Sequence, residues 1–512
     1  MKTILIYFAP LFREFGADIA LRLRDRHPGL KVHGLVAGPP SEAAKLRERL
    51  GDAAGQLISW QQEAEGSWVK TPPSREAFAG FEERYPPGTF GETVTADRRI
   101  GRGFVSCGFP KPNAIGELTV GAPNDIPANY VIGLYGFLER LFEDIEIDAV
   151  FTYVVANAPA LALSKVAEAR GIPFQQIATV RIADRVTIDT SHRGDLRPIA
   201  ARFERFRQNP ELAAPWREQA KGYLTEFRSK PLSPGYQLRH ETRLARQRLW
   251  KAFGKFVSVG VVQSGRYLID RIQSRKTKVA RAYYAFQIQW RSSVVERRYL
   301  RTYEPDGTPY IYYPLHVDPE ASTMVLAPHA TDQMAVLEAL AKSLPAGWRI
   351  VVKENISGIG KRPYGFYERL SQMPGVCLAS TSQSTFELLR GAALTVTITG
   401  TVGWEAFLLG RPVLVLGVAH YSAVGSGVVV GKNLSTLPDL VRAALREPPA
   451  SDEELVLYLC AIFSLSVEMN SELLWGGRYL RCDADIRDRA AEGIARLILD
   501  VRDDAAAKAD AA

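Results

Sequence analysis

The sequence has few cysteines, and none of them has the spacing of a metal or disulfide site. Its 512 residues include only Cys107, Cys377, Cys460 and Cys482, with no CxxC motif and no Cys/His pair at ligand spacing. We therefore expect reduced thiols in a cytoplasmic protein, without disulfides or a structural zinc site.

Long apolar runs are also missing. The opening stretch "MKTILIYFAPLFREFG" is too short to span a bilayer and lacks a small-residue cleavage site. No other stretch reaches about 18 uninterrupted apolar residues. These absences predict a chain that is neither secreted by a visible signal nor integral to the membrane. Peripheral contact at the inner membrane stays open.

What the chain does have is enough apolar material for two or three domains. Hydrophobic residues make up 46% of it, charged residues 23% and aromatic residues 10%, which are ordinary values for a folded protein. The net charge is +8, so the place of the excess positive charge matters more than its size.

Strand and helix patterns alternate in the N-terminal part. Strand-type runs at 3–9, 31–38, 147–155 and 172–178 flank helical patterns at 14–29 and 158–171. Alternation of this kind predicts a parallel, doubly wound sheet.

Residues 196–305 are helical in pattern and rich in Arg and Lys, as in "RHETRLARQRLWKAFGKF". One interpretation is a solvated helical connector. A sharper one is a basic amphipathic surface that docks on anionic lipid or another anionic polymer. Nucleic acid is a weaker option, because no recognition motif accompanies the charge.

The alternation becomes regular after residue 309. Five strands separated by four helices are predicted, and Ser384 with Glu387 forms a capping box. Right-handed crossovers would make all five strands parallel, with their carboxyl ends at one edge where ligands bind. The predicted strands cover 310–316, 349–354, 376–380, 395–399 and 412–417.

The fold class is therefore predicted as α/β, with two Rossmann-like doubly wound domains and a basic helical connecting region. The predicted boundaries are 1–195 for the N-terminal domain, 196–305 for the connector, 306–495 for the C-terminal domain and 496–512 for a disordered tail.

Polar residues follow the predicted strands of the C-terminal domain, with Asp318 and Gln333 among them. Such a set suits a nucleotide-linked sugar, because a glycine-opened helix N-terminus binds phosphate and cations balance its charge. A carboxylate can accept hydrogen bonds from ribose, and acids or a histidine can serve as acid, base or nucleophile. The candidates for chemistry are His316, Glu320 and Asp332; those for nucleotide-sugar binding are Lys353, Glu354, Arg362, Thr399, Gly400, Thr401 and Glu405.

Each candidate also has a purely structural interpretation. Asp332 would cap its helix, and Glu405 would complement a helix dipole. His316 would be a hydrogen-bonded structural histidine, and the basic side chains solvated surface charge. Their shared place at one edge favours a site.

The stretches "YIYYPLHVDPEAST", "VVKEN" and "TITGTVGWEAFLLGRPVLVLG" resemble the capsule polysaccharide biosynthesis proteins of bacteria, as "APALALSKVAEARGIPF" does in the N-terminal part. These are GT-B glycosyltransferases related to the Kdo transferases of capsule assembly. The resemblance therefore implies a GT-B-like fold, with residues 1–195 as the acceptor-side domain and 306–495 as the nucleotide-sugar-binding domain. The resemblance is strongest over about 310–428. It implies transfer of a sugar, from CMP-Kdo or a related nonulosonate donor, to a glycolipid or glycan, with no other cofactor.

One motif departs from the family. Lys353 and Glu354 are followed by Asn355 and Ile356, where the family commonly has His and Pro. Asn355 could donate a hydrogen bond but carries no charge, so the donor stays open. No Asp-x-Asp stands at a GT-A metal position, which predicts metal-independent transfer.

Two other function classes remain open from the sequence. One is a nucleotide-sugar epimerase or a glycerophosphotransferase, since both use similar two-domain sheets. The other is a non-catalytic assembly or export protein with a retained sugar-nucleotide fold.

Overall fold

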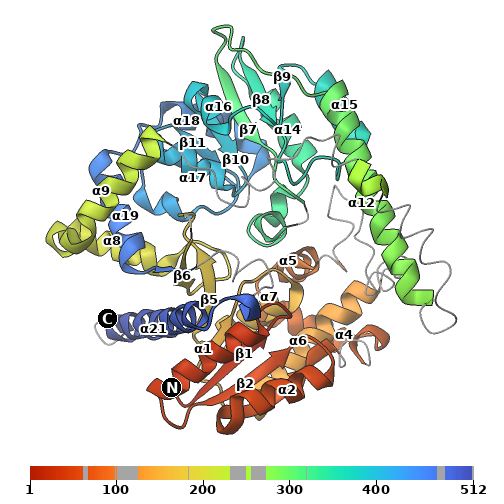
Figure 1. Ribbon diagram of the computed structural model, residues 1–512, viewed down its shortest axis with the longest axis vertical. Coiled ribbons are helices and arrows are strands. Elements are labelled where there is room, and N and C mark those ends of the chain that lie inside the picture. The colour runs from red at the N-terminus through yellow and green to blue at the C-terminus, as the bar shows by residue number, and fades with distance from the viewer. Residues whose placement is uncertain are drawn as a thin grey trace. The chain divides into compact units, whose positions relative to one another are not determined.

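The computed structural model describes residues 1–61, 67–97, 100, 125–182, 184–230, 250–254, 272–318, 320–469 and 479–509. These residues form two compact units, each built on one sheet (Figure 1). Unit 1 takes the described residues within 1–97, 125–223 and 452–509, and unit 2 takes Ile100 and those within 224–451. The predicted α/β class with two Rossmann-like sheets is confirmed.

The sheet of unit 1 has seven strands in the order β3-β2-β1-β4-β5-β6-β13. Strands β1 to β5 pair in parallel, but β6 pairs antiparallel with β5 and with β13. The four strands predicted in this part, which are β1, β2, β4 and β5, pair in parallel as expected. The antiparallel strands β6 and β13 were not predicted, and the connection from β5 to β6 is too short for a parallel crossover. The strands are β1 (Thr3–Phe8), β2 (Lys31–Val36), β3 (Ala54–Ser59), β4 (Val150–Thr152), β5 (Phe174–Thr179), β6 (Arg185–Asp189) and β13 (Val467–Glu468).

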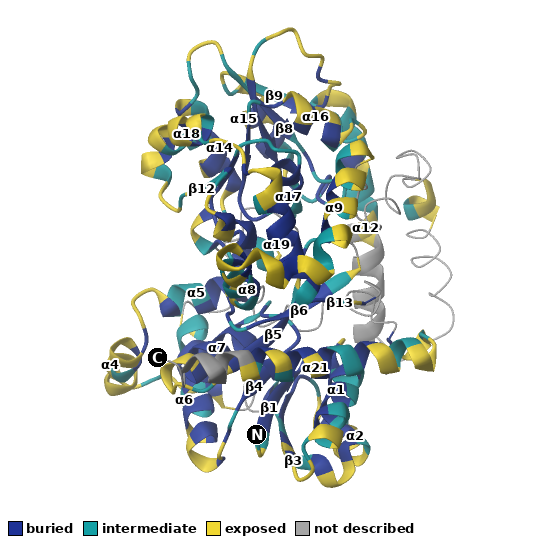
Figure 2. Ribbon diagram, turned by 90° about the vertical axis from the view of Figure 1, so that its left-hand side faces the viewer, coloured by how far each residue is buried: buried dark blue, intermediate teal, exposed yellow. Residues whose placement is uncertain are grey.

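Helices cover this sheet, and its central strands β1, β4 and β5 are largely buried (Figure 2). Ile4, Ile6 and Phe8 alternate along β1 and pack into one apolar core with side chains of α1, α2 and α21. The helices of unit 1 are α1 (Arg13–Arg26), α2 (Pro40–Leu50), α4 (Arg75–Arg84), α5 (Thr89–Ala96), α6 (Ile126–Asp144), α7 (Ala158–Ala169), α8 (Arg197–Gln208), α9 (Ala214–Ser229), α19 (Asp452–Ser464) and α21 (Ala484–Ala509), of which α9 runs on into unit 2.

The sheet of unit 2 has six strands in the order β12-β11-β10-β7-β8-β9, and all its pairings are parallel. This is the strand order of doubly wound nucleotide-binding folds, with the order reversing between β7 and β10. The five predicted strands are present, and β12 is additional. The strands are β7 (Tyr310–Pro314), β8 (Arg349–Lys353), β9 (Val376–Ala379), β10 (Leu394–Thr397), β11 (Val413–Val415) and β12 (Val428–Val430).

The two faces of this sheet bury different helices. Ile311 and Tyr313 belong to a core shared with α14, α15 and α18, whereas the Tyr310 hydroxyl, on the opposite face, donates to the Leu388 carbonyl of α16 at 2.8 Å. The helices of unit 2 are α12 (Ile272–Arg298), α13 (Ala321–Met324), α14 (Gln333–Lys342), α15 (Tyr364–Gln372), α16 (Thr385–Gly391), α17 (Thr401–Leu408) and α18 (Leu437–Arg446).

The compact units differ from the predicted domain boundaries at the C-terminus. Residues 452–495 belong to unit 1, where α19 packs on α8 and α21 packs on α1. The predicted disordered tail 496–512 is helical as far as Ala509, and Leu497, Ile498 and Val501 of this segment are buried. Their apolar face reaches the core, which a composition rich in Ala and Asp does not reveal.

The predicted connector 196–305 is also divided. Its first helix, α8, belongs to unit 1, where Phe203 contacts Tyr458 with ring centroids 5.3 Å apart, and α12 belongs to unit 2. The basic stretches within 231–249 and 255–271 lie outside the described residues, as does Cys107. Among the helices that the structure describes, none is long and apolar enough to cross a bilayer.

Candidate functional site

The carboxyl ends of β7 and β10 meet where the strand order of unit 2 reverses (Figure 1). His316 follows β7, and its Nε2 lies 3.3 Å from both the Thr397 hydroxyl and the backbone nitrogen of Thr399. The Thr399 N–H donates to Nε2, so the neutral imidazole carries its proton on Nδ1. Two segments separated by about eighty residues are thus brought together at the edge predicted to hold the site.

The backbone of His316 is fixed from the neighbouring loops. Its N–H donates to the Gln333 side-chain oxygen at 2.8 Å, and its carbonyl accepts from the Gln333 amide at 3.0 Å. The Arg362 guanidinium donates to the same carbonyl. His316 is therefore held in one orientation by three groups.

Arg362 and Glu354 form a buried ion pair behind this edge. Arg362 Nε lies 2.8 Å from Glu354 Oε2, and the Tyr367 hydroxyl donates to the same oxygen at 2.7 Å. Asp318 is also buried, with its Oδ2 3.6 Å from Arg362 Nη1. Arg362 and Glu354 were both predicted to bind the nucleotide, and both are buried in a hydrogen-bond network that joins the ends of β7 and β8. A direct nucleotide contact by either residue stays a prediction.

The N-terminus of α17 lies at the same edge. Its N-cap is Gly400, which supplies no side-chain hydrogen bond to the first turn. A Cβ at Gly400 would lie 2.9 Å from His316 Nε2, and a Cβ at Gly417 would lie 2.5 Å from Thr399 Cγ2. Glycine at both positions therefore lets the ends of β7, β10 and β11 approach closely.

Glu405 is buried one turn into α17, and Lys353 is half-buried at the end of β8. The Lys353 ammonium donates to the Thr385 hydroxyl at 2.9 Å. Burial raises the pKa of Tyr312 above its ordinary range; a hydrogen bond with Thr385 lowers it, and the carboxylate of Glu405 raises it further. Lys353 thus contacts α16, and Glu405 belongs to α17, which packs beside α16.

The two acids predicted for catalysis are exposed. Asp332 is the N-cap of α14, and its Oδ1 accepts the N–H groups of Met334 at 3.0 Å and Ala335 at 3.4 Å. Glu320 is the N-cap of α13 without a side-chain cap. The capping interpretation of Asp332 is therefore realised, and a catalytic role for either acid stays a prediction.

Asn355, at the position where the resemblance led us to expect histidine, builds a turn. Its side-chain oxygen accepts the Ser357 N–H at 2.8 Å, and its carbonyl accepts those of Gly358 and Ile359. The loop that positions Arg362 thus starts from an asparagine-capped turn.

Three residues of this edge had no place in the predicted site: Thr397, Thr385 and Tyr367. Thr397 precedes Thr399 by two residues, and this alternation along an apolar strand was the one available signal. Thr385 and Tyr367 contact the candidates only through the packing of α16 and α15, which sequence spacing does not show.

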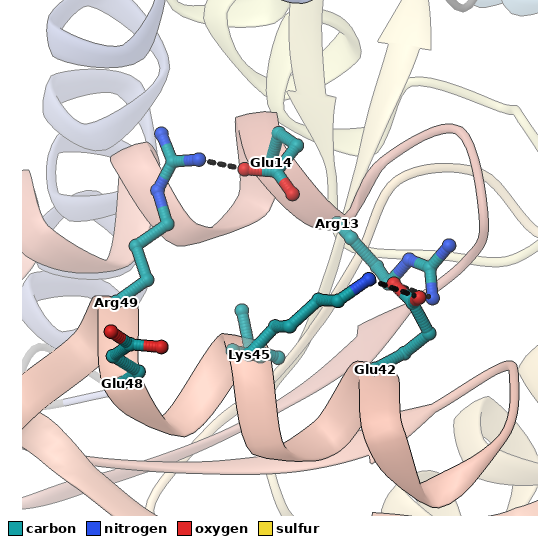
Figure 3. A pocket seen from close by; sticks show the side chains of 7 residues that line it. Arg13, Glu14, Glu42, Lys45, Glu48 and Arg49 are labelled. Atoms are coloured by element: carbon teal, nitrogen blue, oxygen red, sulfur yellow. Dashed lines mark hydrogen bonds and ion pairs between the residues drawn. The ribbon is translucent and has the colours of Figure 1, made fainter.

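A pocket of about 350 Å³ lies elsewhere, between α1 and α2 of unit 1 (Figure 3). Its three basic side chains are balanced by three acidic ones, since Arg13 and Lys45 both pair with Glu42, and Arg49 pairs with Glu14. This compensated charge does not suit an anionic nucleotide, so the pocket does not replace the predicted edge.

The comparisons with known proteins bear on unit 2. Residues 267–434 match the model of a family described as capsule polysaccharide biosynthesis protein. This segment contains all the candidate site residues. No curated protein matches the chain significantly.

Solved structures similar to the chain include two Kdo transferases of KpsC from Thermosulfurimonas dismutans. The beta Kdo 2,4 transferase is 14% identical, with a TM-score of 0.28, covering 61% of this chain and 79% of its own. The beta Kdo 2,7 transferase is 13% identical, with a TM-score of 0.31 and coverages of 67% and 89%. UDP-GlcNAc 2-epimerase from Neisseria meningitidis is 12% identical, with a TM-score of 0.22 and coverages of 91% and 100%.

Similarities this low carry no argument about activity. The chain is similar to the family of capsule polysaccharide biosynthesis proteins over residues 267–434, which are about a third of its length.

Proposed function

We propose that this protein is a glycosyltransferase of capsular or other surface polysaccharide biosynthesis. The observation that carries the proposal is the meeting of His316, Thr399 and the α17 N-terminus where the strand order of unit 2 reverses. Ligands of doubly wound sheets bind outside the carboxyl ends of the strands at this point. The family match supports a role in capsule synthesis.

The donor in this proposal is a nucleotide sugar, CMP-Kdo or a related nonulosonate. Its phosphate would lie at Gly400 and Thr401, where a helix N-terminus favours negative charge. Lys353 would balance that charge, and Glu405 would accept hydrogen bonds from ribose. Unit 1 would supply the site for a glycolipid or glycan acceptor.

The chemistry would use the protein's own groups. His316 accepts the Thr399 N–H at Nε2 and would hold the end of β10 in position beneath the leaving phosphate. Asp332 and Glu320 are exposed carboxylates on the adjoining loop and would serve as acid or base. Transfer is proposed to be independent of metal, so the rate should not change on addition of EDTA.

A panel of CMP-, UDP- and GDP-sugars tests the proposal through thermal stability. We expect stabilisation by one nucleotide class, by about 3 kcal/mol when the ligand is a hundredfold above its Kd. No stabilisation by any nucleotide sugar would overturn the proposal. Conversion of the donor without an acceptor would indicate an epimerase, and binding without conversion or transfer would indicate an assembly protein.

Two substitutions separate the roles of individual residues. Glu405→Gln should weaken donor binding about tenfold or more, because a hydrogen bond to a charged group is lost. Glu387→Gln, at an exposed position of α16, is the matched control and should have no effect. Unchanged donor affinity in Glu405→Gln would remove this residue from the site.

Asp332 needs a variant that keeps its cap. Asp332→Asn retains the side-chain oxygen that caps α14, whereas Asp332→Ala loses it at a cost of about 1 kcal/mol in stability. If Asp332 is catalytic, both variants lose turnover while donor binding persists. If Asp332→Asn keeps full turnover, the carboxylate is only a helix cap.

A further inference from the structure

The positive charge of the chain is concentrated in one segment. Residues 239–301 contain sixteen Lys or Arg and three Asp or Glu, a net charge of +13. Since the whole chain carries +8, the remainder carries −5. The excess positive charge therefore belongs entirely to the segment that contains residues 250–254 and α12.

The C-terminal half of α12 is anchored on unit 2 by one face, beside α15 (Figure 1). Val295 is fully buried in the core, and the Ser292 hydroxyl lies 3.1 Å from the Ile359 carbonyl. Gly360 has a φ of +81°, and a Cβ there would lie 2.2 Å from the Ile288 carbonyl. This close contact fixes which face of the helix points away from the core.

The opposite face carries a row of aromatic side chains, defined here as the aromatic row: Trp250, Phe253, Tyr283, Phe286 and Trp290. Ring centroids along it are 6.2 Å apart for Trp250 and Phe253, 5.7 Å for Phe253 and Phe286, and 6.5 Å for Phe286 and Trp290. Trp250 is 65% exposed, Tyr283 48% and Trp290 51%. Such large aromatic groups are rarely gathered on the surface of a soluble protein without a partner.

Basic side chains accompany the aromatic row. Lys251 lies within it, and Arg297 follows Trp290 by seven residues, which is two helical turns along the same face. The sequence of α12 contains seven basic residues and one acidic residue. Aromatic and basic groups together are the combination that binds an anionic membrane surface.

We propose that the aromatic row and its basic surroundings dock the protein on an anionic phospholipid bilayer. Trp and Tyr favour the headgroup region, where their rings meet apolar chains and their polar atoms meet water, and Phe reaches the acyl boundary. A second copy fits this surface less well, because it would bring two segments of charge +13 together. No nucleic-acid motif accompanies the charge, which disfavours that partner. The docking surface does not depend on the proposed donor site.

Vesicle binding by the full chain tests the proposal. Vesicles of phosphatidylcholine alone are compared with equal parts of phosphatidylcholine and phosphatidylglycerol. We expect sedimentation only with the anionic vesicles, falling as salt rises from about 0.05 M to about 0.5 M because the charges are screened.

The aromatic contribution is tested with a double variant, Trp250→Ala with Trp290→Ala. It should bind anionic vesicles about tenfold or more weakly, since two interfacial anchors are lost. The matched control is Leu11→Ala with Leu480→Ala, which removes side chains 61% and 60% exposed in unit 1 and should leave binding unchanged.

Several results would overturn the proposal. They are equal binding to neutral and anionic vesicles, no binding to either, or wild-type affinity in the tryptophan variant. Loss of self-association or of single-stranded nucleic-acid binding in that variant, with vesicle binding intact, would assign the surface to those partners instead. If the variant fails to fold, the fluorescence of the wild-type tryptophans is measured on vesicles that contain brominated anionic lipid. We expect the lipid to quench this fluorescence, and absence of quenching would overturn the proposal.

Discussion

Arg362 and Glu354 show how a residue at a binding edge can serve the fold. Their side chains are each 1% exposed and 2.8 Å apart, so neither charge is screened by water. Removing one member of a buried pair leaves the other charge uncompensated, which costs far more than loss of a surface pair.

We predict that Glu354→Ala lowers the free energy of unfolding by about 3 to 5 kcal/mol in urea titrations. Asp439→Ala, which breaks the exposed pair with Arg442, is the control and should cost under about 1 kcal/mol. Unchanged stability with lost nucleotide binding would instead make Glu354 a ligand residue.

Two buried side chains of unit 1, Asp189 and His192, contribute to folding stability with opposite dependences on pH. Burial and the neighbouring Asp195 raise the pKa of Asp189 to about 7, against backbone N–H groups of Leu196, Arg197 and Thr190 that lower it. Burial lowers the pKa of His192 to about 3, and Lys165, Arg193 and Arg197 add to this.

The signs follow from proton binding. Between about pH 4 and 7 folded Asp189 keeps a proton that the unfolded chain loses, so its contribution to stability falls as pH rises. Between about pH 3 and 6.5 unfolded His192 binds a proton that the folded chain does not, so its contribution rises with pH. The two slopes oppose one another over the shared range.

We predict that Asp189→Asn gains stability relative to the wild type as pH rises from about 4 to 7, by at most about 1.4 kcal/mol per pH unit. His192→Gln should lose relative stability from about pH 4 to 6.5. Urea unfolding of both variants and the double variant over this range measures the differences. A pH-independent difference for Asp189→Asn would show that the buried Asp189 is ionised throughout.

The residue types of the predicted edge were visible in the sequence, but their partners were not. Strand ends could be found from apolar runs, and this placed His316 and Thr399 on one edge. That Arg362 turns inward to Glu354, or that Lys353 donates to Thr385, depends on loop geometry and on the packing of α15 and α16. Sequence patterns therefore located the edge without separating residues that line it from residues buried behind it.

At the scale of elements, α17 depends on close packing against the loop that follows β11. A Cβ at Gly403 would lie 2.3 Å from the Tyr421 hydroxyl and 2.7 Å from Thr397 Cγ2. The helix can therefore sit against Tyr421 only because position 403 has no side chain.

We predict that Gly403→Ala lowers the melting temperature, since overpacking costs about 1 to 3 kcal/mol. Gly365→Ala in α15 is the matched control, since no atom lies within 4 Å of its Cβ, and it should be neutral or gain up to about 1 kcal/mol. Tyr421→Phe should recover part of the loss in a double-mutant cycle. No recovery would show that the contact with Thr397 dominates.

Element types were predicted well where strands and helices alternate regularly. All five predicted strands of unit 2 appear, whereas β3, β6, β12 and β13 were missed because they are short or lie at sheet edges. Hydrophobic periodicity predicts that a helix has a buried face, but it does not predict on which sheet that face packs. The helices α8, α19 and α21 were misplaced for this reason.

At the scale of the whole molecule, unit 1 is completed by the end of the chain. The Gln175 amide in β5 donates to the Ile498 carbonyl of α21 at 2.9 Å, and Ile498 is fully buried in the core of unit 1. The last helix is therefore part of the first domain's interior.

We predict that Ile498→Ala lowers the free energy of unfolding of unit 1 by about 2 to 5 kcal/mol. Arg496 lies two residues from Ile498, on the exposed side of α21. Arg496→Ala should therefore change the free energy of unfolding by less than about 0.5 kcal/mol. Proteolysis that releases fragments of unit 1 before unit 2 in the first variant would locate the loss. Equal stability of the two variants would show that the C-terminal helix is dispensable.

Residues 452–509 belong to unit 1 although they follow unit 2 in the sequence, and this affects the order in which the two units can fold during translation. The segment 452–509, whose helix α21 packs on α1, β6 and β13, follows the whole of unit 2 in the sequence and is therefore made after it. Unit 2 is complete in the nascent chain earlier than unit 1, against the usual order in which N-terminal domains fold first. The apolar side chains of α1 that pack against α21 thus stay uncovered until unit 2 has been made, so unit 1 is open to aggregation and to chaperone binding for longer than unit 2.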